Sequence, residues 1–529
     1  MIKQIFLDSN IVDFNFVDGL PERSFPEKID YRNADSILVG YFANYDGLVT
    51  SDSLSQIFAG NNLTKLVNSN SDFLLFFLEK KTNRLRIVLD QSNSIPCFFS
   101  YLNGHLVVST QFTKVVGEVK KNTKLNVNFD GLITWLLWEW HATEKTLFEE
   151  IKVIPPGSVV DIDLNNKKLK VESMVDLQGF LANTGEKYTN TVAFAQDWKK
   201  MMLQIVADRA KKILDKKTTC DLSSGFDCTL VAYSLHKILG NQLTCNSKVS
   251  DITKEETDIN IMNKFAKLHK IKLETVDTTK FDQYEANLSS DWNKHDPFQI
   301  AATGFENYLK ILENKGVKVQ FTGEGGDESY SASEMDLSET FPVQNSYFIN
   351  VMYLKKMGLE RLFTKGAVDF SLSKDRFDSR KEYPMIVPTS SAVPTENTFW
   401  SVWEKDIWMM NPFYDTRLIS LARRMPESIK GLKQDRKFTV LSNLPDIFPK
   451  DMFVDKFGRE KAFLGFAKKQ RKFVLEILEN SALDKLGVIS KDAIVKMVEQ
   501  EKSDLDDPEF AIVFQTMMQL DWFLQKNQN

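Results

Sequence analysis

Short runs of aromatic and β-branched residues, separated by turn-forming residues, recur through the first 180 or so residues of the chain. Runs of this length and composition predict β-strands. Asn103-Gly104 lies between two of the runs and has the composition of a hairpin turn. The pattern predicts a β-rich first domain over residues 1–183. Its expected strands are residues 37–42, 72–78, 84–89, 97–101, 105–109, 158–162 and 169–172.

The spacing of the apolar residues changes after Asn183, Thr184 and Gly185, which break the pattern. Phe194 and Trp198 then open a helical repeat of apolar residues. Strand-like and helix-like segments alternate beyond it, which is typical of a parallel α/β sheet, and the chain after residue 334 is predicted to be mainly helical. We therefore predict a second domain over residues 189–529. Its expected strands are residues 218–222, 243–246, 273–276 and 317–321, and its expected helices are residues 228–239, 255–268 and 305–314.

Composition narrows the class of protein further. The net charge of −5 argues against a nucleic-acid partner, and no apolar run approaches the roughly 20 residues that span a bilayer. The first residues lack the apolar segment of a signal peptide. Four scattered cysteines and five histidines predict neither a disulfide framework nor a zinc site. We expect a cytoplasmic protein that binds neither nucleic acid nor membrane.

The segment between the expected strand 218–222 and the expected helix 228–239 suits the binding of an anion. Small residues let backbone N–H groups approach phosphate oxygens, and the helix N-terminus carries a partial positive charge. The segment lacks the spacing and the lysine of a Walker loop, which favours attack at the α-phosphate and release of pyrophosphate. Read alone, the same segment is also compatible with an ordinary N-cap turn. Its candidate binding residues are Leu222, Ser223, Ser224, Gly225, Asp227 and Cys228.

A second glycine-rich segment, residues 323–328, follows the expected strand 317–321. Three glycines and three acids at a strand end are poor core material but suit a metal and nucleotide site at the carboxyl edge of a parallel sheet. Asp227 and Asp327 are the candidate ligands of a magnesium ion. Taken by itself, this segment could equally be an acidic turn.

With both segments in hand, the chain resembles the asparagine synthetase family. Relatives usually show L-S-G-G-L-D-S followed later by G-E-G-x-D-E, and here these motifs stand at residues 222–228 and 323–328. The resemblance extends to residues 86–101, with Asp90 and Pro96, and to residues 145–157. It continues with residues 411–415 and with Met425-Pro426, so it covers most of the chain.

The resemblance implies an α/β protein in two parts. The first is an Ntn-hydrolase-like αββα sandwich, which in the family acts as a glutaminase. The second is a doubly wound parallel-sheet domain of the PP-loop ATP pyrophosphatase type, with a helical extension. The implied cofactors are ATP and Mg²⁺. In the implied reaction a carboxylate attacks the α-phosphate, pyrophosphate leaves, and an amine then displaces AMP.

The family's glutaminase uses a cysteine at the mature N-terminus, whereas this sequence opens Met1-Ile2 and its first cysteine is Cys97. We therefore expect the first domain to keep the fold without glutaminase activity. In this respect the chain resembles β-lactam synthetases and the macrolactam cyclases of lasso-peptide pathways, and a lasso-type cyclase is the leading interpretation. The expected substrate is a peptide or small molecule that carries both a carboxylate and an amine, and a leader peptidase or leader-binding protein is a candidate partner. The alternatives are an asparagine synthetase that uses free ammonia and a nucleotide-binding scaffold without turnover.

The resemblance also implies roles for single residues. Glu324 would orient the substrate or accept the amine proton, and Lys461 would neutralise charge at the phosphorus, with Lys456 as the alternative lysine. Each of these three could also be an ordinary solvated side chain. The implied nucleotide-binding residues beyond the first loop are Ser247, Gly323, Gly325 and Lys437.

The first loop departs from the family's motif at three positions. Ser224 replaces the second glycine, Phe226 replaces the leucine, and Cys228 replaces the serine, which removes a good hydroxyl donor. Serine at position 224 is tolerable only if its φ is negative.

Overall fold

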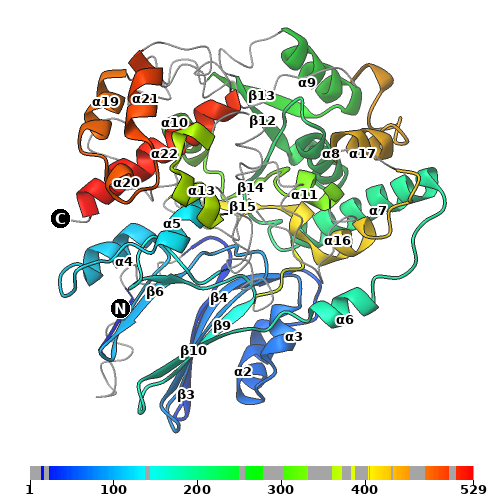
Figure 1. The fold of residues 1–529 in the computed structure, drawn as a ribbon. Coiled ribbons are helices and arrows are strands. Elements are labelled where there is room, and N and C mark those ends of the chain that lie inside the picture. Colours follow the sequence, from blue (N-terminus) through cyan, green and yellow to red (C-terminus); the bar gives the residue numbers. More distant parts are fainter. Residues whose placement is uncertain are drawn as a thin grey trace.

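The computed structural model describes residues 13–16, 23–136, 143–249, 256–277, 302–331, 360–371, 383–387, 403, 405–429, 433–452, 471–499 and 508–527. All structural statements below concern these residues. Figure 1 shows the strands of the first part of the chain in its lower half and a second, parallel sheet above them. None of the helices described combines the length and apolar composition that a membrane span requires.

Two β-sheets form the first part of the chain. The larger sheet has the order β10-β9-β5-β4-β3-β2, and the smaller has the order β1-β7-β6-β8. The neighbouring strands β3 and β4 pair in register from Ser36↔Glu79 to Asn44↔Ser71. Both strands are almost continuously apolar because both of their faces are covered. The strands are β1 Asp13–Phe16, β2 Glu27–Arg32, β3 Ser36–Asn44, β4 Ser71–Glu79, β5 Arg84–Leu89, β6 Phe98–Leu102, β7 His105–Ser109, β8 Lys152–Val153, β9 Ser158–Asp163 and β10 Lys168–Ser173.

These two sheets pack face to face, with a layer of helices on each outer side. Phe76 of the larger sheet and Phe99 of the smaller sheet belong to one buried cluster between them. Helices α2 (Ser51–Ala59) and α3 (Leu63–Val67) cover the larger sheet, and α4 (Phe112–Val119) and α5 (Phe129–Leu136) cover the smaller one. The layers therefore follow the order helix, sheet, sheet, helix. The sequence pattern had indicated seven of these ten strands. It had missed β1, β2 and β8 and the four short helices.

The parallel sheet has the order β13-β12-β11-β14-β15, and all of its neighbouring strands run in the same direction. From β11 the chain adds β12 and β13 on one side and β14 and β15 on the other. The strand order therefore reverses between β11 and β14, which is where ligands bind in open α/β sheets. The strands are β11 Thr218–Asp221, β12 Thr244–Val249, β13 Lys272–Asp277, β14 Val319–Phe321 and β15 Trp408–Met410.

Helices cover both faces of this sheet. On one face, α7 (Thr191–Ala210), α8 (Phe226–Leu239) and α9 (Glu256–His269) share a buried cluster with Cys220 and Phe321. On the other face, α10 (Ala302–Asn314) packs through Leu309 and Leu312 against Val276 and Met409. The sheet is thus doubly wound, as predicted.

Three details of the predicted elements differ from the structure. Helix α10 begins at Ala302, three residues before the predicted start. Helix α8 begins at Phe226, two residues before the predicted start, so Asp227 belongs to its first turn rather than to the loop. Strand β15 lies within the stretch beyond residue 334 that was predicted to be mainly helical. Its three residues are too few for an alternating pattern to be visible.

The C-terminal helices return to the first part of the chain. Helix α22 (Pro508–Asn527) packs beside α5, and the Phe523 ring lies 5.9 Å from that of Phe112 and 6.3 Å from that of Phe148. Helices α19 (Arg471–Glu479), α20 (Ala482–Lys485) and α21 (Lys491–Glu499) belong to the same cluster. Because two apolar clusters join the expected domains, the boundary between residues 183 and 189 stays a prediction.

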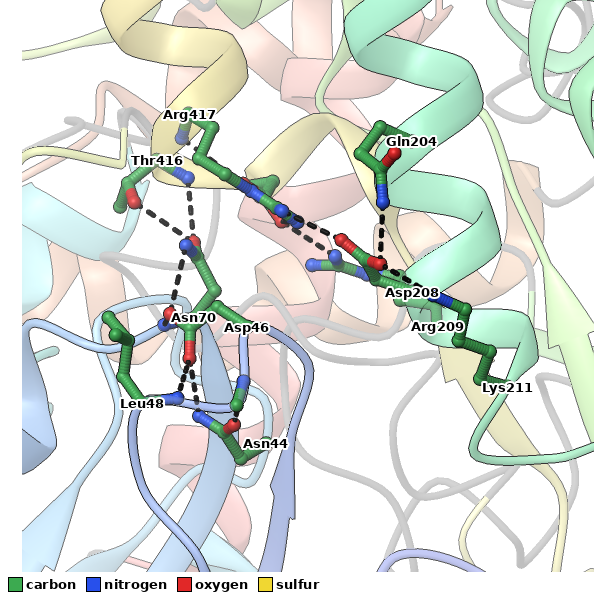
Figure 2. A network of polar contacts seen from close by, with 12 residues as sticks. Asn44, Asp46, Leu48, Asn70, Gln204, Asp208, Arg209, Lys211, Thr416 and Arg417 are labelled. Atoms are coloured by element: carbon green, nitrogen blue, oxygen red, sulfur yellow. Dashed lines mark hydrogen bonds and ion pairs between the residues drawn. The ribbon is translucent and has the colours of Figure 1, made fainter.

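A polar network also joins the two parts (Figure 2). The Asn70 Oδ1 atom accepts hydrogen bonds from the backbone N–H and the hydroxyl of Thr416, both at 2.9 Å. The next residue along, Arg417, reaches Asp208 on α7 at 2.7 Å, as Figure 2 shows. The side chains of Asp46 and Asn44 hold the loop that presents Asn70, since Asp46 Oδ2 accepts from the Asn70 N–H at 2.8 Å.

Asp415 is the buried centre of this junction. Its carboxylate is fully buried and accepts from Arg209 Nη1 at 2.7 Å and from Arg417 Nε at 2.9 Å. Burial alone would raise the pKa of Asp415, but the two guanidinium groups outweigh it and hold the pKa below its ordinary value. The Asp415 side chain also accepts from the N–H of Arg417 and so caps helix α16 (Thr416–Ala422).

We predict that Asp415→Ala lowers the free energy of unfolding by about 3–5 kcal/mol, because it leaves the buried Arg209 charge without its carboxylate. Denaturant titration at neutral pH measures the change. Lys187→Ala is the control, since Lys187 pairs with Glu427 at an exposed site and its loss should cost less than about 1 kcal/mol. Equal effects of the two substitutions would contradict a buried anchoring role for Asp415.

Candidate functional site

The two loops singled out in the sequence lie next to each other where the strand order reverses. The first loop links β11 to α8, and the second links β14 to the short helix α11 (Gly326–Ser331). Both leave the carboxyl end of their strand. The Leu222 N–H donates to the Asn246 carbonyl at 2.9 Å, which extends the pairing of β11 with β12 by one residue into the first loop.

The first loop is held in shape by its own hydroxyl groups. The Gly225 N–H donates to Ser223 Oγ at 3.0 Å, and the Thr229 hydroxyl donates to the Gly225 carbonyl at 2.5 Å. Ser224 is not among the residues with positive φ, so its side chain is compatible with this position, as the sequence required. Gly225 is the N-cap of α8, and Asp227 places an acid in the first turn, where it interacts favourably with the helix dipole.

The glycines of the second loop are required by close contact. A Cβ atom on Gly323 would lie 2.8 Å from the Asp227 carbonyl carbon. At Gly326 a Cβ atom would lie 2.8 Å from the Asp227 Cβ, and Gly325 has φ +84° and faces the Tyr414 ring. No side chain fits between this loop and the first turn of α8. The glycines therefore let Asp327 approach Asp227.

Lys437 joins the two carboxylates. It comes from α17 (Lys433–Leu441), and its ammonium group contacts Asp227 Oδ2 and lies 2.6 Å from Asp327 Oδ1. Its side chain is only 6% exposed. Burial lowers the pKa of Lys437, but Asp227 and Asp327 outweigh that effect and raise it, so the ammonium stays charged. The Lys437 Nζ atom also lies 5.7 Å from the centre of the Tyr330 ring.

Residues 411–416 contact the second loop and the helix that follows it through hydrogen bonds. The Thr322 hydroxyl donates to Asn411 Oδ1 at 2.6 Å, and the Ser329 hydroxyl donates to the Phe413 carbonyl at 2.8 Å. The segment ends at Thr416, which Asn70 of the first part of the chain holds. The motif at 411–415 had marked this segment in the sequence, but nothing had indicated that it links the domain junction to the loop.

The remaining predicted site residues are less closely connected to the two loops. Glu324 is exposed, and its N–H donates to Thr322 Oγ1 at 3.2 Å. Ser247 is buried, and its hydroxyl donates to the Met262 sulfur at 2.9 Å, a weak acceptor. Cys228 is buried at the start of α8. Lys461 and Lys456 lie outside the described residues, so their roles stay predictions.

The chemistry of this site fits a divalent cation. Asp227 and Asp327 converge on a single positive group, the Lys437 ammonium, and these two carboxylates would be the protein ligands of a metal ion. Magnesium is often held by one or two carboxylates, with water and substrate phosphates completing its shell. Within the described ranges no three or more His, Cys, Asp and Glu side chains gather into a metal-binding group. Magnesium at this point would therefore depend on the phosphates of a nucleotide.

No family model matches the chain, and no curated protein matches it. Among solved structures, the U34-tRNA thiolase NcsA from Methanococcus maripaludis with its 4Fe-4S cluster is 14% identical, with 58% of this chain and 80% of the thiolase covered and a TM-score of 0.25. Glutamine phosphoribosylpyrophosphate amidotransferase from B. subtilis, complexed with ADP and GMP, is 9% identical, with 58% of this chain and 60% of the amidotransferase covered and a TM-score of 0.18. Both TM-scores are too low to show a shared fold or a shared site.

We predict that Gly323→Ala lowers the free energy of unfolding by about 1–3 kcal/mol, since the new methyl group would overlap the backbone of Asp227 and Cys228. Gly117→Ala is the matched control. Gly117 lies in α4 with open space around it, so alanine should be neutral there or stabilise the helix by up to about 1 kcal/mol. Thermal and denaturant unfolding of both variants measure the difference, and an unchanged Gly323→Ala protein would refute the close contact.

Proposed function

We propose that the protein is an ATP-dependent amide-bond synthetase that releases pyrophosphate and AMP. The proposal is based on the convergence of Asp227 and Asp327 on the Lys437 ammonium group. This point lies beside the N-terminus of α8, where the strand order reverses. This arrangement offers a carboxylate pair for Mg²⁺ and a helix N-terminus for phosphate within one small region.

The proposed reaction has two steps. A substrate carboxylate oxygen attacks the α-phosphorus of ATP, the bond to the bridging oxygen breaks, and pyrophosphate leaves. An amine then attacks the activated acyl carbon, AMP leaves, and the amine proton passes to a base. The first loop would hold the pyrophosphate, and Lys437 would contact a phosphate. Glu324 is exposed beside the second loop and is the proposed proton acceptor.

The absence of a Walker-type lysine in the first loop favours attack at the α-phosphate over attack at the γ-phosphate. The resemblance to the asparagine synthetase family supports the same assignment. It also places Lys461 as the residue that neutralises charge at the phosphorus. ATP and Mg²⁺ are accordingly the proposed cofactors.

A finer proposal concerns the source of the amine. The four cysteines are all buried, so none of them can act as an exposed thiol for glutamine hydrolysis. An amine of the same substrate molecule fits this finding, and a lasso-type macrolactam cyclase is the form of the enzyme that we favour from the sequence resemblance. A peptidase or leader-binding protein would then be a partner. Free ammonia is the second candidate amine, which would make the protein an asparagine synthetase.

Exchange of labelled pyrophosphate into ATP tests the first step. We expect exchange that depends on a carboxylate from a panel of peptides and amino acids, and we expect Asp327→Asn and Lys461→Ala to abolish it. Loss of a metal carboxylate or of the charge-neutralising lysine removes transition-state stabilisation worth at least about 10²-fold in rate. Gly117→Ala is the control, since Gly117 lies in α4, which packs on the smaller sheet of the first part of the chain, away from α8 and α11 (Figure 1).

The results of these assays distinguish the proposed synthetase from a scaffold without turnover and from an asparagine synthetase. Near-normal exchange in Asp327→Asn or Lys461→Ala would refute the role given to that residue. No exchange with any carboxylate, in a folded protein that binds ATP, would favour a scaffold without turnover. Asparagine formed from aspartate, ATP and ammonium would select the asparagine synthetase reading over ring closure.

A further inference from the structure

A buried lysine occupies the point where the two proposed magnesium carboxylates meet. The Lys437 side chain is 6% exposed, whereas the side chains of Asp227 and Asp327 are 18% and 36% exposed. Solvent therefore reaches the carboxylates more easily than it reaches the ammonium. The carboxylates come from α8 and α11, and the lysine comes from a third helix, α17.

An ammonium group and a divalent cation cannot share this position. Both would need the same carboxylate oxygens, and their positive charges would repel each other strongly at contact distance in a partly buried site. Entry of a metal ion therefore requires Lys437 to leave at least one carboxylate. The four-carbon side chain of lysine can swing to a new partner without movement of the helix backbone.

We propose that Lys437 is an internal counter-ion that closes the divalent-cation site until a nucleotide arrives. The nucleotide brings phosphate oxygens, which accept the ammonium as it leaves the carboxylates, and the metal ion takes its place. Lys437 is therefore a positioning residue that exchanges carboxylate for phosphate. The inference rests on the proposed function for the identity of the metal and the nucleotide.

This exchange makes metal and nucleotide binding cooperative. Without nucleotide, a metal ion must displace an ammonium for which the described residues offer no acceptor beyond Asp227 and Asp327, so the affinity for the metal is low. With nucleotide, the same displacement gives the ammonium a phosphate partner, and the affinity rises. The coupling is reciprocal, because each ligand must favour the other by the same factor.

Electron paramagnetic resonance of Mn²⁺, a probe for Mg²⁺, tests the proposal on the full chain without nucleotide. The wild-type protein should bind Mn²⁺ weakly, and Lys437→Met should bind one Mn²⁺ ion at least about tenfold more tightly, because the carboxylates lose their internal cation. Methionine keeps an unbranched side chain of similar length and so preserves the packing. Lys318→Met is the matched control, since Lys318 pairs with a single carboxylate, that of Asp406.

Further variants decide the origin of the new binding. Adding Asp327→Asn to Lys437→Met should remove the gained Mn²⁺ site, and Lys318→Met should not create one. Equal Mn²⁺ affinities of folded wild-type and Lys437→Met proteins would overturn the proposal. If Lys437→Met does not fold, titration of the wild-type protein still tests the proposal. Tight binding of Mn²⁺ to the wild-type protein without nucleotide would overturn the proposal if Asp327→Asn abolished that binding.

These results are independent of turnover. A protein that shows no pyrophosphate exchange but gains an Mn²⁺ site in Lys437→Met keeps this inference and loses the proposed function. A protein that shows exchange but gains no Mn²⁺ site keeps the function and loses the inference.

Discussion

The candidate site depends on the direct approach of one backbone segment to another. Residues 323–326 lie against the first turn of α8 so closely that a single methyl group would not fit at Gly323 or Gly326. Only this approach brings two carboxylates from distant parts of the sequence to one point. Two negative charges held together would repel each other, and the buried Lys437 ammonium offsets that repulsion. The glycines set the geometry, and the lysine makes it stable.

The described residues of the first part of the chain contact the site through packing and hydrogen bonds. The chain from Asn411 to Thr416 contacts the second loop at one end and Asn70 at the other, while Asp415 fixes it to α7 through Arg209. Interiors are close-packed, so a displacement at the junction passes to the elements that rest on it. Contacts of the β-sandwich thus help to position the carboxylate pair.

The features that could be predicted from the sequence are those that depend on residues close together in the chain. The change of apolar spacing near Gly185 separated a β-rich part from an α/β part, and glycines next to acids marked both loops. The sequence did not reveal features that depend on contacts between distant residues. Lys437 was linked to phosphate only by family resemblance, and its contact with Asp227 and Asp327 could not be read from spacing. Strand β15 and helices α2 to α5 are too short to show a clear period.

One apolar cluster joins the β-sandwich helices to helices at the other end of the chain. Phe112, Leu132 and Phe148 are buried in part by Met517 and Phe523 of α22. During synthesis on the ribosome, the outer face of α4 and α5 therefore stays uncovered until several hundred further residues have been made. The sandwich cannot complete this apolar cluster before α22 has been made, and apolar surface exposed in the meantime favours non-native association.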